Sequence, residues 1–284
     1  DIMSKIGILV CGNSGVDYEK VAYPFEVIHS TLIINNKEYE DYIDITADEF
    51  YDILSKNSNV SLSTAQASTG LIVTKLEKLK SEGYDEVIAV IISSALSGTA
   101  QNVKLAGELV EGIKLHLVDS HTVSYGQMFL VNKTIEMIKA GKPANKIVET
   151  LEAMKEKIQV YVLVDTLKFL VKNGRLSATS GAIGSLLKIK PLLNFSKDGK
   201  LVPYEKIRTA SKARARLIEI IKEEIDKGVE ELFFAYTNNK PYVEGIQAEI
   251  KEYAPKLVTR VVSLTPVVGA HAGPGTCGVG ILRK

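Results

Sequence analysis

The chain of 284 residues is poor in several features that would mark a special class of protein. It has no tryptophan and only two cysteines, Cys11 and Cys277, which is too few for a disulfide scaffold or for a metal site built from cysteine alone. We expect both to be small buried thiols. The 35 Lys and Arg residues almost cancel the 34 Asp and Glu residues, so the basic excess typical of nucleic-acid-binding proteins is missing.

Long hydrophobic runs are missing as well. No apolar run is long enough to span a bilayer, so we expect no transmembrane segment and at most transient contact with a membrane surface. The opening segment has neither a basic start nor a small-residue cleavage site, which predicts a cytoplasmic protein. The composition, 45% hydrophobic and 24% charged, is typical of a soluble globular protein, and the length suits one large or two ordinary domains.

The first half of the chain alternates strand-like and helix-like segments. Runs of β-branched residues bounded by turn residues predict strands at 6–11, 27–34, 87–92 and 115–119. Apolar periodicity and a capping box at Thr46 and Glu49 predict helices at 46–55, 69–80, 99–110 and 122–140. This alternation indicates an α/β fold with a mainly parallel sheet flanked by helices, where ligands bind beyond the carboxyl ends of the strands.

From about residue 161 the pattern changes to a short strand, a short helix and a D-G hairpin turn in "SKDGKL". Helices are predicted at 211–227 and 242–252, and strands at 232–236 and 259–264. We therefore predict a second α/β domain, with the two domains spanning 1–157 and 158–284. No helix or strand is predicted for the stretch "VVGAHAGPGTCGVGIL". Its glycines predict that the backbone comes close to a neighbouring segment.

The loop "ISSALSGTAQN" follows a predicted strand and precedes a predicted helix. It offers the hydroxyls of Ser93, Ser94, Ser97 and Thr99 at a helix start, where N–H groups attract anions. Its only glycine is Gly98, too few for a phosphate cradle, and neither a P-loop nor a dinucleotide fingerprint is present. Ordinary helix capping is the favoured explanation for any one hydroxyl, whereas for four hydroxyls in one loop an anion site and a capped loop remain equally open.

Three further residues are candidates for chemistry. Thr64 lies in a second hydroxyl stretch, residues 61–70, which either adds donors to the same place or is a polar loop with a helix cap. His271 lies among glycines and can donate to a carboxylate or act as a base, although a structural histidine is the common alternative. Arg175 either ends a helix in solvent or contacts a ligand, and the apolar residues after it fit a core or a tunnel wall.

Taken in order and together, several segments resemble the DegV family of bacterial fatty-acid-binding proteins, which serve as acyl carriers for a fatty-acid kinase. The resemblance runs nearly from end to end and rests on "STAQAS", "ISSALSGTAQN", "VDSHTVSYG", "LKFLVKNGRLS", "GSLLKIKPLLNFSKDGKLVPYEKIRT" and "VVGAHAGPGTCGVG". It implies two α/β domains with a lipid chain buried between or within them. It also implies a non-catalytic protein of phospholipid metabolism that holds a long-chain fatty acid, such as a C16 or C18 chain.

The resemblance also assigns roles to residues of this sequence. It implies that Thr64 and Ser94 hydrogen-bond the fatty-acid carboxylate, with His271 nearby and Ser93 as an alternative to Ser94. Arg175 and Arg208 match arginines that the family uses near the carboxylate or toward the kinase, so the implied partner is a fatty-acid kinase catalytic protein that forms the acyl phosphate. The resemblance implies no metal, no cofactor besides the fatty acid, and no nucleic acid.

Two positions depart from the family pattern. The first strand is usually followed by a T-D-S segment, whereas this chain has Cys11, Gly12 and Asn13, with glycine in place of the aspartate. Ala67 stands where proline is usual in the segment around Thr64. We therefore expect the first loop to differ in its contacts with the headgroup or with the partner.

Two other functions compete with the carrier as explanations of these residues. A serine hydrolase would use Ser94 or Ser97 as nucleophile, His271 as base and Asp119 to orient it, but the loop lacks the G-x-S-x-G nucleophile elbow. A nucleotide-dependent enzyme needs a glycine-rich frame after the first strand, and Gly12 and Gly15 do not provide one.

Overall fold

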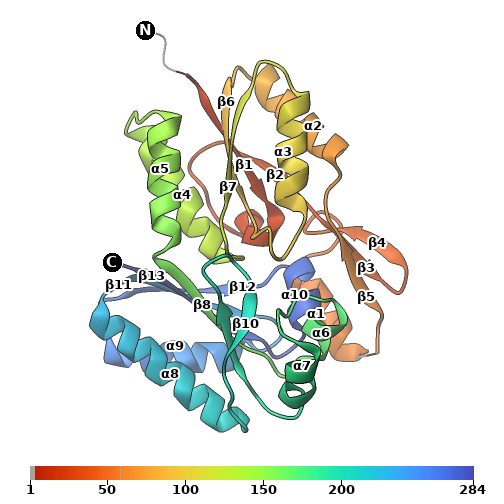
Figure 1. The fold of residues 1–284 in the computed structure, drawn as a ribbon, viewed down its shortest axis with the longest axis vertical. Coiled ribbons are helices and arrows are strands. Elements are labelled where there is room, and N and C mark those ends of the chain that lie inside the picture. Colours follow the sequence, from red (N-terminus) through yellow and green to blue (C-terminus); the bar gives the residue numbers. More distant parts are fainter. Residues whose placement is uncertain (1–3, 58) are drawn as a thin grey trace.

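The computed structural model describes residues 4–57 and 59–284 (Figure 1). The strands are β1 (Ile6–Cys11), β2 (Glu26–Ile28), β3 (Thr31–Ile34), β4 (Lys37–Glu40), β5 (Leu62–Ala65), β6 (Glu86–Ile91), β7 (Lys114–Asp119), β8 (Ile158–Leu163), β9 (Leu192–Phe195), β10 (Leu201–Glu205), β11 (Val229–Tyr236), β12 (Val258–Ser263) and β13 (Cys277–Arg283). The helices are α1 (Ala47–Lys56), α2 (Thr69–Ser81), α3 (Thr99–Leu109), α4 (Tyr125–Lys139), α5 (Ala144–Lys155), α6 (Lys168–Lys172), α7 (Ser180–Leu186), α8 (Ala210–Lys227), α9 (Lys240–Tyr253) and α10 (Pro266–Ala272), with two 3-10 turns, Gly12–Ser14 and Val16–Tyr18, after β1.

The first sheet is parallel and has the strand order β2-β1-β6-β7. Helices α2 and α3 cover one face of it, and α4 and α5 cover the other (Figure 1). Both faces are therefore apolar: Ile8 and Val10 of β1 pack on the α4 side, while Leu9 packs on the α2 side. The predicted α/β fold with a parallel sheet flanked by helices is confirmed.

The prediction of one strand over 27–34 is wrong. Strand β2 pairs with β1 and ends at Ile28, whereas β3 begins at Thr31 and pairs antiparallel with β4 and β5 in a separate three-stranded sheet. The break falls at His29, whose buried ring lies 2.9 and 3.1 Å from the two carboxylate oxygens of Asp17. The β-branched pattern is the same on both sides of this break and does not reveal it.

Two other segments also differ from expectation. Residues 61–70 contain β5, which pairs with β3, before Ser68 caps α2 by accepting a hydrogen bond from the Leu71 N–H at 3.1 Å. Helix α4 begins at Tyr125 instead of residue 122, because Ser124 adopts φ 59° outside the helical region. The glycine-rich C-terminal stretch, for which the sequence predicts no helix or strand, forms α10 and the central strand β13.

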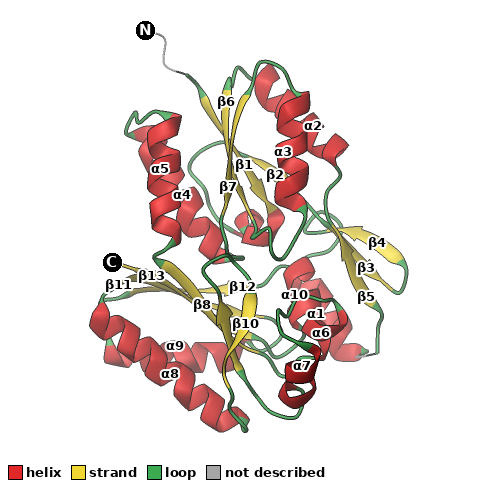
Figure 2. Cartoon of the chain, viewed as in Figure 1, coloured by secondary structure: helices red, strands yellow, loops and turns green. Residues whose placement is uncertain are grey.

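The second sheet is mixed and has the order β10-β9-β8-β13-β11-β12. Only β11 and β12 run parallel; the other neighbours are antiparallel. Helices α8 and α9 cover its outer face (Figure 2), and its inner face turns toward α4. Helix α10 packs instead on the three-stranded sheet and α1, where Val267 and Ala270 share a core with Leu32 and Phe50. The domain boundary at 157 stays a prediction.

Candidate ligand-binding cavity

A cavity of about 430 Å³ lies where these layers meet. This volume is within the range of roughly 300–1,000 Å³ typical of small-molecule sites. One part of its wall is polar and includes Asn13, Ser30, Thr64, Gln66, Ser97, Ser124, Arg175 and His271. The larger part is apolar and includes Val160, Val162, Leu170, Phe195, Leu201, Phe233, Ala235, Leu264, Val267 and Val268. Such a lining suits a ligand that has a polar group and a large apolar part.

Thr64 and His271 meet at the polar end of the cavity. β5 holds Thr64 opposite Leu32 of β3, and α10 carries His271 in its last turn. The Thr64 Oγ1 and His271 Nε2 atoms are 2.7 Å apart. Burial, helped by the positive charge of Arg175, lowers the pKa of His271 to about 4, so the ring is neutral at pH 7. Its buried Nδ1 has no hydrogen-bond partner among the described residues.

Arg175 supplies a positive charge to the same wall. It follows Gly174, whose φ of 67° ends the turn after α6. Its Nε donates to the Leu96 carbonyl at 2.8 Å and its Nη1 donates to the Asn173 carbonyl at 2.7 Å. These bonds fix the guanidinium, and no described carboxylate pairs with it. A fixed, unpaired cation beside a neutral histidine favours an anionic ligand.

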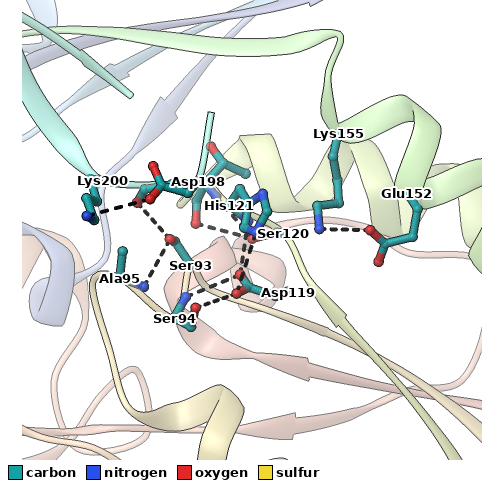
Figure 3. A network of polar contacts seen from close by, with 12 residues as sticks. Ser93, Ser94, Ala95, Asp119, Ser120, His121, Glu152, Lys155, Asp198 and Lys200 are labelled. Atoms are coloured by element: carbon teal, nitrogen blue, oxygen red, sulfur yellow. Dashed lines mark hydrogen bonds and ion pairs between the residues drawn. The ribbon is translucent and has the colours of Figure 1, made fainter. Parts of the chain in front are cut away.

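Ser93 and Ser94 are not among the cavity-lining residues, and their hydroxyls form hydrogen bonds with other parts of the protein. The buried Ser93 Oγ donates to the Gly199 carbonyl at 2.7 Å. Ser94 is exposed; its Oγ donates to Asp119 Oδ2 at 2.5 Å and its N–H donates to Oδ1 at 3.2 Å (Figure 3). Ser97 is the hydroxyl of this loop that lines the cavity. Ser93 and Ser94 thus hold the loop against β7 and the β9–β10 turn.

Ser94, His271 and Asp119 do not form a triad in the described structure, and the other candidate nucleophile, Ser97, has its Oγ 2.7 Å from Thr99 Oγ1. His271 Nε2 contacts Thr64, whereas Ser94 bonds Asp119 directly. A triad needs the histidine between the serine and the carboxylate, so that it can take the serine proton. The geometry therefore does not support Ser94 as a nucleophile activated by His271.

Arg208 lies apart from the cavity. It is exposed in the segment between β10 and α8, and the described part of the chain offers its guanidinium no hydrogen bond or ion pair. It does not line the cavity. A ligand in the cavity would not contact it in this arrangement.

Sequence reasoning missed Thr276 of the cavity wall and three polar residues at the edge of the parallel sheet, Asn13, Ser30 and Ser124. These three follow β1, β2 and β7, at the edge where ligands of parallel sheets bind, and that position was the available signal. The neighbouring Gly12 makes room there, because a Cβ at this position would lie 3.1 Å from the ring of His29. The altered first loop therefore contributes directly to the cavity.

A family model described as "Uncharacterised protein, DegV family" matches residues 8–284. The chain belongs to the DegV family. Among curated DegV relatives, a DegV domain-containing protein of Clostridium acetobutylicum is 34% identical over 284 residues, covering 99% of this chain and 100% of the relative. These findings confirm the resemblance that the sequence motifs indicate.

Solved DegV structures share the fold. A fatty acid binding DegV family protein from Streptococcus agalactiae superposes with a TM-score of 0.90 at 30% identity, covering 99% of both chains. DegV from Bacillus subtilis, described as a fatty acid binding protein, gives 0.89 at 29% identity, covering 99% of this chain and 100% of that one. In the described part of this DegV chain, no helix is both long enough and apolar enough to cross a bilayer.

Proposed function

We propose that this protein binds a long-chain fatty acid in the cavity and presents its carboxylate to a separate fatty-acid kinase. The observation that carries the proposal is a single cavity whose lining is mainly apolar and also includes Thr64, His271 and Arg175. The similarity to DegV proteins described as fatty acid binding supports the same ligand class. A chain such as C16 or C18 is the expected ligand.

Most of the affinity is expected to come from the acyl chain. Each buried methylene contributes about 0.8 kcal/mol, so a long chain outweighs the headgroup. A hydrogen bond to the charged carboxylate adds about 1.5–3 kcal/mol. The headgroup contacts would therefore mainly orient the ligand, with the carboxylate at the polar end.

Thr64, His271 and Arg175 are the residues that we propose contact the carboxylate. Ser93 and Ser94 would act indirectly, because their bonds to Gly199 and Asp119 hold the loop that carries Ser97. Thr64→Val keeps the shape but removes the hydroxyl, and we expect it to weaken fatty-acid binding roughly tenfold, the loss of one charge-assisted bond. Ser94→Ala is the matched hydroxyl deletion.

Titration calorimetry of the two delipidated variants separates these roles. A larger loss of affinity for Thr64→Val than for Ser94→Ala supports the proposed headgroup position. The reverse order would move the carboxylate to the Ser94 side of the loop.

The chemistry of acyl-phosphate formation would belong to the kinase, with this chain as a non-catalytic carrier. The separation of Ser94 from His271 supports that division, because no activated nucleophile results from it. Arg175 at the cavity and the exposed Arg208 are the residues that we propose face the kinase.

Native mass spectrometry of protein purified from a bacterial host, followed by lipid extraction, tests the ligand. We expect a bound fatty acid of defined length that is released on denaturation. A protein that stays lipid-free after incubation with a panel of fatty acids would overturn the proposal. A fluorophosphonate probe that labels Ser94 would instead favour the hydrolase.

A further inference from the structure

The inner face of the six-stranded sheet forms one wall of the apolar part of the cavity. Val162 of β8, Gly278 of β13 and Ala235 of β11 lie side by side on neighbouring strands, because Gly278 is in register with both other residues. All three line the cavity. The cavity wall is recessed at this row, because its central residue, Gly278, has no side chain.

The next row on the same face is filled by an aromatic ring. Gly280 is in register with Phe233, and a Cβ at Gly280 would overlap the Phe233 ring, so the ring lies across the glycine. The ring centroid lies 5.8 Å from that of Tyr125 and 5.7 Å from that of Phe129, both on α4. Phe233 lines the cavity, whereas Gly280 and Leu282, farther along β13, are not among its described lining residues. Along β13 the described lining therefore ends at the row of Gly280, where the Phe233 ring and Val160, its neighbour on β8, form the wall.

Gly278 differs from Gly280 in the space above it. A Cβ at Gly278 would meet only the Cβ of Ala235, at 3.5 Å, which is an ordinary van der Waals contact. Its backbone is not in the left-handed region, so a larger residue fits the strand without strain. A side chain at this position would project into the cavity.

We propose that Gly278 and Phe233 set the length of the acyl chain that this cavity accepts. Gly278 leaves space in the cavity wall for the acyl chain. The Phe233 ring, which lies over Gly280, limits how far the methyl end of the acyl chain can extend. The inference rests on the proposed fatty-acid function and adds to it the residues that select among ligands.

Opposite changes at the two positions should shift the preference in opposite directions. Each buried methylene contributes about fourfold in affinity, and a valine at position 278 adds three carbon atoms, which take the space of roughly three methylenes. Gly278→Val should therefore weaken binding of the longest accepted fatty acid roughly sixtyfold and spare shorter ones, with Gly278→Ala giving a smaller shift of roughly fourfold. Phe233→Leu should open the space over Gly280 and favour longer chains.

The experiment measures dissociation constants of delipidated wild type and variants for saturated fatty acids from C12 to C20 by titration calorimetry. Gly70→Ala is the matched control for Gly278→Ala, because Gly70 is exposed and has open space around it. Thermal unfolding shows which variants are folded, and Gly278→Ala and Phe233→Leu keep the test available if Gly278→Val does not fold.

A shorter preferred chain for the Gly278 variants, a longer one for Phe233→Leu and no change for Gly70→Ala would support the inference. An unchanged preference in the folded Gly278 and Phe233 variants, with wild type still binding fatty acid, would overturn it alone. Wild type that binds none of the acids would overturn the proposed function, and the inference with it.

Discussion

At the scale of single residues, His271 shows how burial prepares a side chain for a ligand. Loss of solvent and the nearby Arg175 hold its pKa at about 4, so its ring stays neutral beside the Thr64 hydroxyl over the physiological range. A neutral ring has one donor and one acceptor nitrogen, so Nε2 can donate to the Thr64 hydroxyl, which keeps its own proton for a ligand. This state suits a carboxylate that must be bound without a permanent ion pair to histidine.

The same pKa predicts how stability depends on pH. The unfolded chain protonates His271 near pH 6.5 but the folded chain only near pH 4, so the unfolded state binds more protons between these values. The contribution of His271 to the free energy of unfolding is therefore fully present above about pH 6.5, and it is lost as the pH falls toward 4. Between pH 7 and 4.5 we expect the free energy of unfolding of the wild type to fall about 2 kcal/mol more than that of His271→Gln.

Urea unfolding of ligand-free protein at the two pH values checks this expectation. His116→Gln is the control, because His116 pairs with Glu86 at the far end of the first sheet, away from the cavity. Equal pH dependence in wild type and His271→Gln would show that the ring titrates normally in the fold.

At the scale of elements, α10 is held in place by α1. Tyr51 of α1 is buried, and its hydroxyl donates to the Leu264 carbonyl at 2.8 Å, just before α10 begins. Gly269 of α10 permits this approach, because a Cβ there would overlap the Tyr51 hydroxyl and lie 2.8 Å from its Cζ. The position of His271, two residues later on the same helix, therefore depends on a glycine that is not among the cavity-lining residues.

Gly269→Ala should displace α10 and affect both stability and binding. Overpacking of this kind costs about 1–3 kcal/mol, and we expect weaker fatty-acid binding because His271 moves with the helix. Denaturant unfolding and titration calorimetry measure the two effects.

Tyr51→Phe provides the control for that contact. It removes the hydroxyl that the new Cβ would strike, so the double variant should lose less stability than the sum of the two single variants. Strictly additive losses would mean that Gly269 does not make room for Tyr51.

At the scale of the whole molecule, the near-zero net charge hides an uneven distribution. Residues 168–216 contain twelve Lys and Arg but only two Asp and Glu, in a chain whose net charge is +1. This segment runs from α6 to α8 and includes Arg175 and Arg208. A partner that docks there is expected to present acidic groups, since complementary charge speeds association.

Arg208→Ala tests that expectation without disturbing the cavity. Arg208 is exposed and lies outside the lining, so we expect unchanged thermal stability and unchanged fatty-acid affinity. Acyl-phosphate formation with the kinase should fall several-fold, and more at low salt than at high salt. Lys251→Ala on the exposed face of α9 is the control, and full turnover by Arg208→Ala would remove it from the partner surface.

Most elements could be predicted from the sequence because their signals are local. The capping box at Thr46 marks the start of α1, and the alternation of β-branched runs with amphipathic segments indicates the parallel sheet. The turn at Asp198 and Gly199 marks the hairpin of β9 and β10, with Gly199 at φ 82°. The split of 27–34 and the strand β13 escaped prediction, because long-range pairing decides both.

The sequence by itself determined the family, the α/β class and the short list of polar residues, since ordered motifs and residue chemistry are properties of the chain. Only the tertiary structure decided which of these residues share one cavity. Thr64 and His271 are 207 positions apart and meet at 2.7 Å, whereas Ser94, in the strongest hydroxyl motif, turns to Asp119. Contacts of that kind depend on how α10 packs against the three-stranded sheet, and no local pattern in the sequence records that packing.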